Sequence, residues 1–394
     1  MESTPKSNRL HVAFFGKRNS GKSSLINQLA GHQAALVSDI PGTTTDPVYR
    51  PIELPGIGAC VLVDTAGFDD EGSLGGMRVS QTRKIVDKTD IAVMVCTEAD
   101  CEEEAEWLRT LDEKNIPSVL VLNKADRLED AGEVAREIEK QCGRIPVIIS
   151  ARESSGTDEI MRAIAGRIPK DSEQPPIVGD LADEGDCVVL VMPQDAQAPK
   201  GRLILPQVQT IRELLDKKCM VVCCTPESFQ TTLRTLAFPP KLIITDSQVF
   251  AAVYAGKPSQ SKLTSFSILF ARQKGDIWYF AESAAVIDCL DESSRVLIAE
   301  ACTHAPQRED IGRVKIPALL RKRVGEGLQI DVVSGSDFPA DLSGYSLIIH
   351  CGACMFNRRH VMSRVESAKK QGIPMTNYGV AIAYLNGILE KIEY

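Results

Sequence analysis

The chain has 394 residues, more than one hydrophobic core usually supports, so two or three domains are expected. Charged residues make up 25% and no apolar run is long enough to cross a bilayer, so the composition is that of a globular protein without membrane association. The formal net charge of −8 argues against a broad nucleic-acid-binding face and leaves small molecules and proteins as the expected partners.

The first ten residues, MESTPKSNRL, lack the basic-then-apolar pattern of a signal peptide, which predicts a cytoplasmic location. In that reducing compartment the twelve cysteines are not expected to form disulfides. Clustered cysteines are therefore candidate metal ligands, and scattered ones are expected to be small core residues, as at Cys60, Cys96, Cys142 and Cys289.

Short β-rich runs alternate with amphipathic stretches from Leu10 to Ile168. This alternation predicts βαβ units and a mostly parallel sheet. The expected strands cover residues 11–16, 60–67, 91–96, 118–126 and 147–151.

The proline-bearing segment 168–180 is typical of a linker. After it, strands are expected at residues 186–195, 219–225 and 241–246, with helices at 207–218, 227–236 and 247–256. A weaker break at 255–262 opens a third part, with strands at 295–300, 328–335 and 345–350 and two helices in the last forty residues. The predicted fold class is α/β throughout, with domains at residues 1–170, 171–262 and 263–394.

The segment GKRNSGKSS, residues 16–24, matches the phosphate-binding loop G-x-x-x-x-G-K-S and lies between a strand and a helical pattern, as this motif requires. Its glycines let backbone N–H groups surround phosphates, Lys22 neutralises the β- and γ-phosphates, and the Ser23 hydroxyl ligates Mg²⁺. The nucleotide-binding residues expected from this loop are Gly16, Asn19, Ser20, Gly21, Lys22, Ser23 and Ser24.

Three further motifs indicate GTP as the nucleotide. Asp64-Thr65-Ala66-Gly67 ends a strand, where the carboxylate can hold Mg²⁺ through water and the Gly67 N–H can reach the γ-phosphate. In Asn123-Lys124-Ala125-Asp126, the Asp126 carboxylate can accept two hydrogen bonds from guanine, which adenine could not supply. Ser150 and Ala151 follow another strand and can cover the base.

A polar loop, PGTTTDP, supplies the switch I threonine. Thr44 is the favoured ligand for Mg²⁺ and the γ-phosphate, and Thr43 is the alternative. The residues assigned to catalysis are Lys22, Thr44, Asp64 and Gly67.

In these motifs residues 10–168 resemble the TrmE and Era branch of translation-factor-like GTPases. Phe68 stands where the more familiar GTPases place a glutamine that orients the attacking water, so slow hydrolysis is expected. Asn19 matches the loop asparagine that ligates K⁺ in potassium-activated members of this branch, which implies stimulation by K⁺.

A second group of candidate ligands lies far downstream, after two of the expected strands. Cys302 and His304 follow the strand at 295–300, and His350, Cys351 and Cys354 follow the strand at 345–350. If these strands are parallel in one sheet, the ligands converge at one edge. A helical pattern begins immediately after Cys354, and its dipole would favour thiolates.

The spacing of these residues alone does not identify the metal that they would bind. Two cysteines and two histidines suit tetrahedral zinc, whereas three cysteines suit a 4Fe–4S cluster with one iron left to another ligand. The pattern C-x-H, then H-C-x-x-C, behind a TrmE-like GTPase and a small α/β domain resembles the HydF family of maturation GTPases for iron-only (FeFe) hydrogenases.

This resemblance implies a scaffold or carrier for the diiron subcluster of the hydrogenase active site. Its partners would be radical-SAM maturases and apo-hydrogenase, and its middle domain would pair two subunits. Cys302, Cys351 and Cys354 match the cluster thiolates. The resemblance leaves open whether His304 and His350 are ligands or neighbours of the ligands, and which group is the fourth ligand.

Two other functions remain as alternatives. One is a ribosome- or tRNA-directed GTPase with a zinc-stapled C-terminal domain, against which the acidic net charge and the lack of an RNA-binding pattern count. The other is a redox enzyme that uses the cluster for electron transfer, against which the incomplete cysteine set counts.

Overall fold

The computed structural model describes residues 9–31, 47–69, 82–168, 175–193, 203–301, 310–335, 337–353 and 356–394. The chain divides into two compact units, Met1–Glu173 and Gln174–Tyr394. Five predicted site residues lie outside the described ranges: Thr43, Thr44, Cys302, His304 and Cys354.

The first unit contains a six-stranded sheet in the order β2-β3-β1-β4-β5-β6. All neighbouring strands are parallel except β2, which pairs antiparallel with β3 at the edge. The strands are β1 (Leu10–Phe15), β2 (Val48–Leu54), β3 (Gly58–Asp64), β4 (Ile91–Cys96), β5 (Ser118–Leu122) and β6 (Val147–Ile148).

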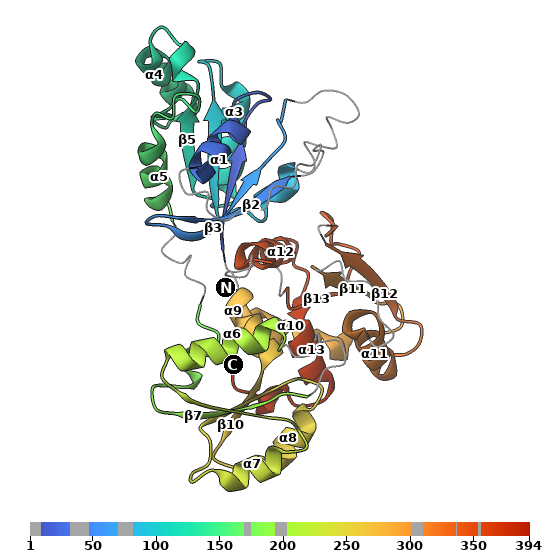
Figure 1. Ribbon diagram of the computed structural model, residues 1–394. Coiled ribbons are helices and arrows are strands. Elements are labelled where there is room, and N and C mark those ends of the chain that lie inside the picture. Colours follow the sequence, from blue (N-terminus) through green and yellow to red (C-terminus); the bar gives the residue numbers. More distant parts are fainter. Residues whose placement is uncertain are drawn as a thin grey trace. The chain divides into compact units, whose positions relative to one another are not determined.

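Helices cover both faces of this sheet, because successive side chains of a strand point to opposite faces. Val12 and Phe14 of β1 pack with apolar residues of α1 and α5, whereas Ala13 and Phe15 pack with residues of α3 and α4. Figure 1 shows these helices around the strands. They are α1 (Lys22–Gly31), α3 (Glu102–Glu113), α4 (Ala131–Cys142) and α5 (Thr157–Ala165).

The second unit contains two parallel four-stranded sheets. The first has the order β10-β9-β7-β8 and the second the order β12-β11-β13-β14. Their strands are β7 (Cys187–Val191), β8 (Met220–Cys224), β9 (Leu242–Thr245), β10 (Lys262–Ser265), β11 (Arg295–Glu300), β12 (Gln329–Ser334), β13 (Leu347–His350) and β14 (Met375–Asn377).

One apolar core joins these two sheets, since Val189 and Ile243 of one sheet belong to the same buried cluster as Leu297 and Ile348 of the other. The helices of the unit are α6 (Leu205–Asp216), α7 (Phe229–Thr235), α8 (Phe250–Gly256), α9 (Phe266–Lys274), α10 (Ile277–Ala284), α11 (Ile316–Val324), α12 (Arg358–Lys370) and α13 (Tyr378–Leu385) (Figure 1). In the part of the chain that is described, no helix has the length and apolarity to cross a membrane.

The predicted α/β class is confirmed, and six strands and α-helices were not anticipated. The edge strand β2, the short strands β10 and β14, and the helices α9, α10 and α11 have no counterpart in the sequence prediction. β14 lies between the two helices expected in the last forty residues. Of the scattered cysteines, Cys289 is exposed, so its assignment to the core is wrong, whereas Cys142 is partly buried and packs against the core of the first unit.

Candidate functional site

The loop between β1 and α1 needs glycine at both glycine positions of the motif. Gly16 and Gly21 have φ values of 150° and 92°. A Cβ atom at Gly16 would lie 2.4 Å from the Val95 carbonyl oxygen, and one at Gly21 would lie 2.3 Å from Nδ2 of Asn123. The loop therefore passes close against the neighbouring strands, with its backbone N–H groups available to surround phosphates.

The Lys22 side chain folds back over this loop. Its Nζ donates hydrogen bonds to the backbone oxygens of Gly16 and Lys17, both at 2.8 Å, and only 6% of the residue is exposed. The hydroxyl of Ser20 is buried and has no hydrogen-bond partner among the described residues. A cation and an unsatisfied hydroxyl thus face the same loop that would hold a polyphosphate.

Ser23 and Asp64 form the part of the site that suits Mg²⁺. The Ser23 hydroxyl donates to Oδ2 of Asp64 at 2.5 Å, and Oδ1 of Asp64 is buried with no hydrogen-bond partner in the described chain. Hydroxyl and carboxylate oxygens are the donors that Mg²⁺ prefers. These two residues therefore fit the metal that the motif implies.

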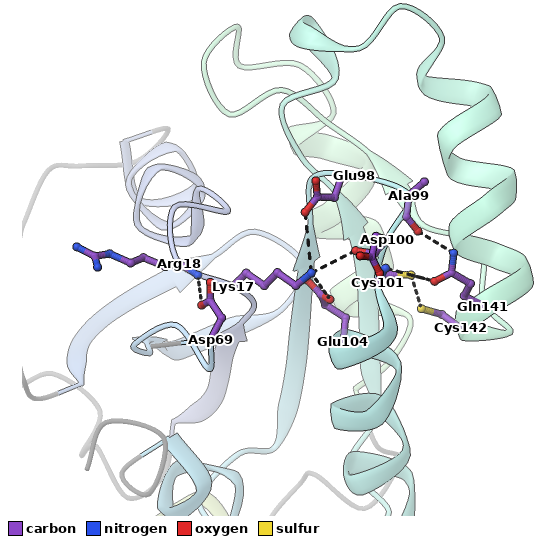
Figure 2. A network of polar contacts seen from close by, with 10 residues as sticks. All are labelled: Lys17, Arg18, Asp69, Glu98, Ala99, Asp100, Cys101, Glu104, Gln141 and Cys142. Atoms are coloured by element: carbon purple, nitrogen blue, oxygen red, sulfur yellow. Dashed lines mark hydrogen bonds and ion pairs between the residues drawn. The ribbon is translucent and has the colours of Figure 1, made fainter. Parts of the chain in front are cut away.

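Gly67 lies directly against the phosphate-binding loop. A Cβ atom there would be 2.6 Å from the backbone nitrogen of Arg18. That nitrogen donates to Oδ1 of Asp69 at 2.5 Å, which fastens the two loops together (Figure 2). Any side chain at position 67 would force these loops apart.

Phe68, which occupies the position of the water-orienting glutamine, is packed into the core of the first unit. It is 8% exposed and its ring stacks on Trp107, with centroids 5.4 Å apart and planes at 20°. Trp107 in turn stacks on Phe15. An apolar side chain held in this way cannot orient a water molecule.

Asn123 connects three of the predicted motifs. Its Nδ2 donates to the Ser20 carbonyl oxygen at 2.9 Å, and its Oδ1 accepts from the Ala151 N–H at 3.1 Å. The residue is 1% exposed. The side chain of Asn123 therefore joins the phosphate loop to the loops that would hold the base.

Asp126 is supported by Ser150, whose hydroxyl donates to its Oδ1 at 2.6 Å. This hydrogen bond holds the pKa of Asp126 below its ordinary value, so the carboxylate is ionised at neutral pH. An ionised carboxylate can only accept hydrogen bonds, as recognition of the guanine N–H groups requires.

In the second unit, the strands β11 and β13 are parallel neighbours, with Ala299 opposite His350. The expectation that both strands end at one edge of a sheet is confirmed. At this edge the Cys351 sulfur accepts hydrogen bonds from the backbone N–H groups of Ala301 at 3.0 Å and Ala353 at 3.4 Å. Two amide donors to one sulfur suit a thiolate, and such hydrogen bonds surround the sulfurs of iron–sulfur clusters. Cys351 therefore fits the cluster that the ligand pattern implies.

His350 is fully buried and both of its ring nitrogens have partners. Nδ1 lies 2.6 Å from the Cys351 carbonyl oxygen, and Nε2 lies 2.9 Å from Nη1 of Arg364. A guanidinium only donates, so Nε2 accepts and Nδ1 carries the proton. Burial and then the Arg364 charge lower the pKa of His350 to about 3, so the ring is neutral. In this arrangement neither nitrogen is available to a metal.

The loop that follows Cys351 is held by Lys274, a buried lysine at the end of α9. Its Nζ donates to the carbonyl oxygens of Ala353 at 3.0 Å and Phe356 at 2.9 Å. The helix expected immediately after Cys354 begins only at Arg358, because the Asn357 side chain caps it by accepting from the His360 N–H.

Besides Lys274, two residues near this loop were missed by sequence reasoning. Arg364 contacts His350, and the buried hydroxyl of Tyr378 has no hydrogen-bond partner among the described residues. Neither belongs to a motif. Arg364 lies on α12, the helix expected after Cys354, but its contact with His350 is set by packing, and Tyr378 is the first residue of α13. Within the described ranges, no group of three or more His, Cys, Asp or Glu side chains could hold a metal ion, and three of the five predicted ligands lie outside those ranges.

The phosphate loop, the Ser23–Asp64 pair and the Asn123–Asp126 loop define a P-loop GTPase domain. A family model described as 50S ribosome-binding GTPase matches residues 11–124. The hydrogen maturase F dimerization and tetramerization domain models match residues 177–275 and 278–393, together more than half of the chain. The chain belongs to the hydrogen maturase F (HydF) family, which confirms the resemblance seen in the sequence.

Curated relatives match the GTPase region. The chain is 35% identical over 166 residues to the tRNA modification GTPase MnmE of Bordetella petrii, covering 41% of this chain and 34% of that protein. It is 38% identical over 137 residues to GTPase Der of Wolinella succinogenes, covering 33% of this chain and 28% of that protein. The chain thus spans about a third of the length of these relatives.

Two solved structures are similar in fold alone. Aquifex aeolicus Era bound to GDP.AlF4- has 19% identity and a TM-score of 0.35, covering 55% of this chain and 92% of that one. The probable GTP-binding protein engB has 22% identity and a TM-score of 0.33, covering 40% of this chain and 98% of that one.

Proposed function

We propose that this chain is a GTP-hydrolysing scaffold or carrier protein that binds a 4Fe–4S cluster and assembles or delivers the diiron subcluster of the FeFe-hydrogenase active site. Its partners would be radical-SAM maturases and apo-hydrogenase. The observation that carries the proposal is the Cys351 sulfur, which accepts two backbone hydrogen bonds at a sheet edge of a hydrogen maturase F domain.

In the GTPase domain, hydrolysis breaks the bond between the γ-phosphorus and the β–γ bridging oxygen, and water supplies the new oxygen. Lys22 stabilises the charge that develops on the phosphates. Ser23, Asp64 and Thr44 would hold Mg²⁺, which would neutralise charge on the β- and γ-phosphates. The Gly67 N–H contacts the γ-phosphate, and Asp126 selects guanine.

Hydrolysis is slow in this proposal, because the buried ring of Phe68 cannot orient the attacking water. K⁺ would compensate in part by placing a further positive charge beside the phosphates, in addition to Lys22 and Mg²⁺. Its ligand would be Asn19, an exposed loop residue whose φ of 56° lies in the left-handed region. Faster turnover in KCl than in matched NaCl supports this role, and equal rates exclude it.

The cluster thiolates would be Cys302, Cys351 and Cys354, which leaves one iron open to an exchangeable ligand. A 4Fe–4S cluster supplies soft thiolate-bound iron on which another iron group can be carried. His350 would position Cys351 through its hydrogen bond to the Cys351 carbonyl oxygen, and it would not bind iron.

Matches to dimerization and tetramerization domains support a homodimer or a higher oligomer. We propose that the dimer forms through β8, which lies at one edge of its sheet and therefore presents unpaired backbone groups. Large apolar side chains on and beside this strand are exposed, including Met220 at 59% and Leu215 at 54%. Burial of these side chains against the second subunit would add apolar contact area to the β8 interface.

The test is iron, zinc and acid-labile sulfide analysis, with a visible spectrum, on protein purified and reconstituted without oxygen. Iron with an equal amount of sulfide supports the scaffold. Zinc without sulfide overturns it and favours a tRNA- or ribosome-directed GTPase, the class to which the similarity to MnmE would then point.

A further inference from the structure

The GTPase domain contains two thiols in contact. The sulfurs of Cys101 and Cys142 lie 3.3 Å apart (Figure 2). Cys101 is fully buried and directly precedes α3, whereas Cys142 is the last residue of α4 and is partly exposed. The contact therefore joins two helices on the same face of the sheet, and one of its two residues, Cys142, is partly exposed.

Gln141, which precedes Cys142, fixes the position of Cys101 relative to the end of α4. Its Oε1 accepts from both the backbone nitrogen and the sulfur of Cys101, each at 3.3 Å, and its Nε2 donates to the Ala99 carbonyl oxygen at 2.8 Å. The segment from Ala99 to Cys101 is thus fastened to the end of α4, which keeps the sulfurs at this short separation without a covalent bond.

The two thiols have different pKa values. A hydrogen bond from Cys96, supported by one from Cys142, lowers the pKa of Cys101 to about 7, whereas burial and the contact with Cys101 raise the pKa of Cys142 to about 12. At neutral pH a fraction of the pair is therefore an anion in contact with a thiol. The anion resides on Cys101, whose pKa is the lower of the two, and the Cys142 thiol is its neighbour at 3.3 Å.

The same segment supports the phosphate-binding loop. Lys17 Nζ donates to the Asp100 carbonyl oxygen at 3.3 Å and lies 3.7 Å from the buried carboxylate of Glu104 (Figure 2). The Lys17 carbonyl oxygen in turn accepts from Lys22 at 2.8 Å. Two hydrogen bonds, one from Lys17 to Asp100 and one from Lys22 to Lys17, therefore connect the residue next to Cys101 with Lys22, the lysine that would bind the phosphates.

We propose that Cys101 and Cys142 are a redox modification site, which hydrogen peroxide converts to a disulfide that lowers GTP turnover and which a thiol reductant restores. The site lies outside the cluster ligands and adds a control of the GTPase that the proposed scaffold function does not contain.

The chemistry balances with peroxide as the oxidant. The Cys101 thiolate attacks one peroxide oxygen, the O–O bond breaks, and hydroxide leaves with the electron pair, giving a sulfenic acid at Cys101. The Cys142 sulfur then attacks the Cys101 sulfur, forms the S–S bond and displaces a second hydroxide, which takes up the Cys142 proton. The two hydroxides take up the two thiol protons, so two thiols and one peroxide give a disulfide and two waters.

The movement of the two sulfurs on disulfide formation is large enough to lower GTP turnover. A disulfide is about 2.05 Å long, so the sulfurs must approach by more than about 1 Å. A catalytic constellation must be held within roughly 0.5 Å. Because Asp100 adjoins Cys101, this approach shifts the carbonyl that anchors Lys17 and displaces the phosphate-binding loop.

The experiment uses the full chain, purified without oxygen, reduced, and then treated with equimolar hydrogen peroxide. Proteolysis under non-reducing conditions followed by mass spectrometry should reveal a linked peptide that contains Cys101 and Cys142. GTP turnover should fall by about threefold or more and recover with dithiothreitol. An unlinked pair in the peroxide-treated chain, or a linked pair with unchanged turnover, overturns the proposal.

Matched variants separate this pair from the other cysteines. Cys142→Ser should give no linked peptide and keep its turnover in peroxide, whereas Cys289→Ser, which removes an exposed cysteine elsewhere, should respond as the native chain does. Peroxide damage to a bound cluster would occur in both variants, so it does not affect the difference in GTP turnover between them. Equal loss of turnover in Cys142→Ser contradicts the assignment, and the linked-peptide analysis of the native chain tests it independently.

Discussion

Lys22 is the residue on which GTP turnover depends most directly, because its ammonium is the buried cation of the phosphate-binding loop. We expect Lys22→Ala to lower GTP turnover by about a hundredfold or more, since removing one stabilising donor from a transition state costs this much. Phosphate release measures the effect, with Lys140→Ala on the exposed face of α4 as the control. A turnover within twofold of the control, roughly 0.4 kcal/mol, would contradict the assignment.

Asp126 carries guanine selectivity through an ionised carboxylate that Ser150 supports. In Asp126→Asn an amide replaces the carboxylate, and its N–H₂ can donate to the additional oxygen of xanthine. We therefore expect the variant to bind xanthosine triphosphate better than GTP, as competition with a fluorescent nucleotide measures. If GTP remains preferred, the base is recognised elsewhere.

Cys351 and His350 are adjacent, and we expect their substitutions to affect the iron–sulfur chromophore differently. Cys351→Ser should deplete the iron–sulfur chromophore, because a hydroxyl is a poor substitute for a soft thiolate. His350→Gln should keep the chromophore with altered stability, because this histidine contacts Arg364 and a backbone carbonyl. Absorbance and iron content measure both. Equal depletion in the two variants would make His350 a ligand.

Motif residues such as Lys22, Ser23 and Asp126 could be predicted because phosphate, Mg²⁺ and guanine fix both the residue type and the local spacing. The contact of Asn123 with Ser20 could not be predicted, since it joins residues 103 positions apart. Lys274 and Arg364 were missed for the same reason. Their partners near Cys351 are set by tertiary packing.

Among the secondary-structure elements, α3 and the loop that carries Phe68 are coupled by the stacking of Phe68 on Trp107. GTP contacts the neighbouring Gly67 in the proposed site, so we expect binding of a non-hydrolysable GTP analogue to change the tryptophan fluorescence. Trp107→Phe should abolish the change and Trp278→Phe should keep it, since these are the two tryptophans of the chain. The reverse pattern would show that the loop around Phe68 does not respond.

Elements with strong hydrophobic runs were predicted, as in β4 and β5, whose residues are all buried. The missed strands have weaker patterns. β2 is a partly exposed edge strand that contains Pro51, and β10 and β14 have four and three residues. Their strand conformation depends on pairing with β3, β9 and β13, which no local pattern reveals.

At the scale of the whole molecule, the described nucleotide-binding residues lie in the first unit, and Cys351 lies in the second. No residue is assigned to both sites. We therefore expect GTP to control partner exchange through the loops around Thr44 and Phe68, while cluster assembly proceeds without it.

The measurement that tests this account most directly is activation of apo-hydrogenase by the anaerobically reconstituted chain with the radical-SAM maturases, compared with Lys22→Ala and Cys351→Ser. The account predicts that Lys22→Ala keeps its iron–sulfur cluster and activates poorly, and that Cys351→Ser keeps its GTP turnover and does not activate. Loss of the cluster in Lys22→Ala, or full activation by folded Cys351→Ser, would contradict it.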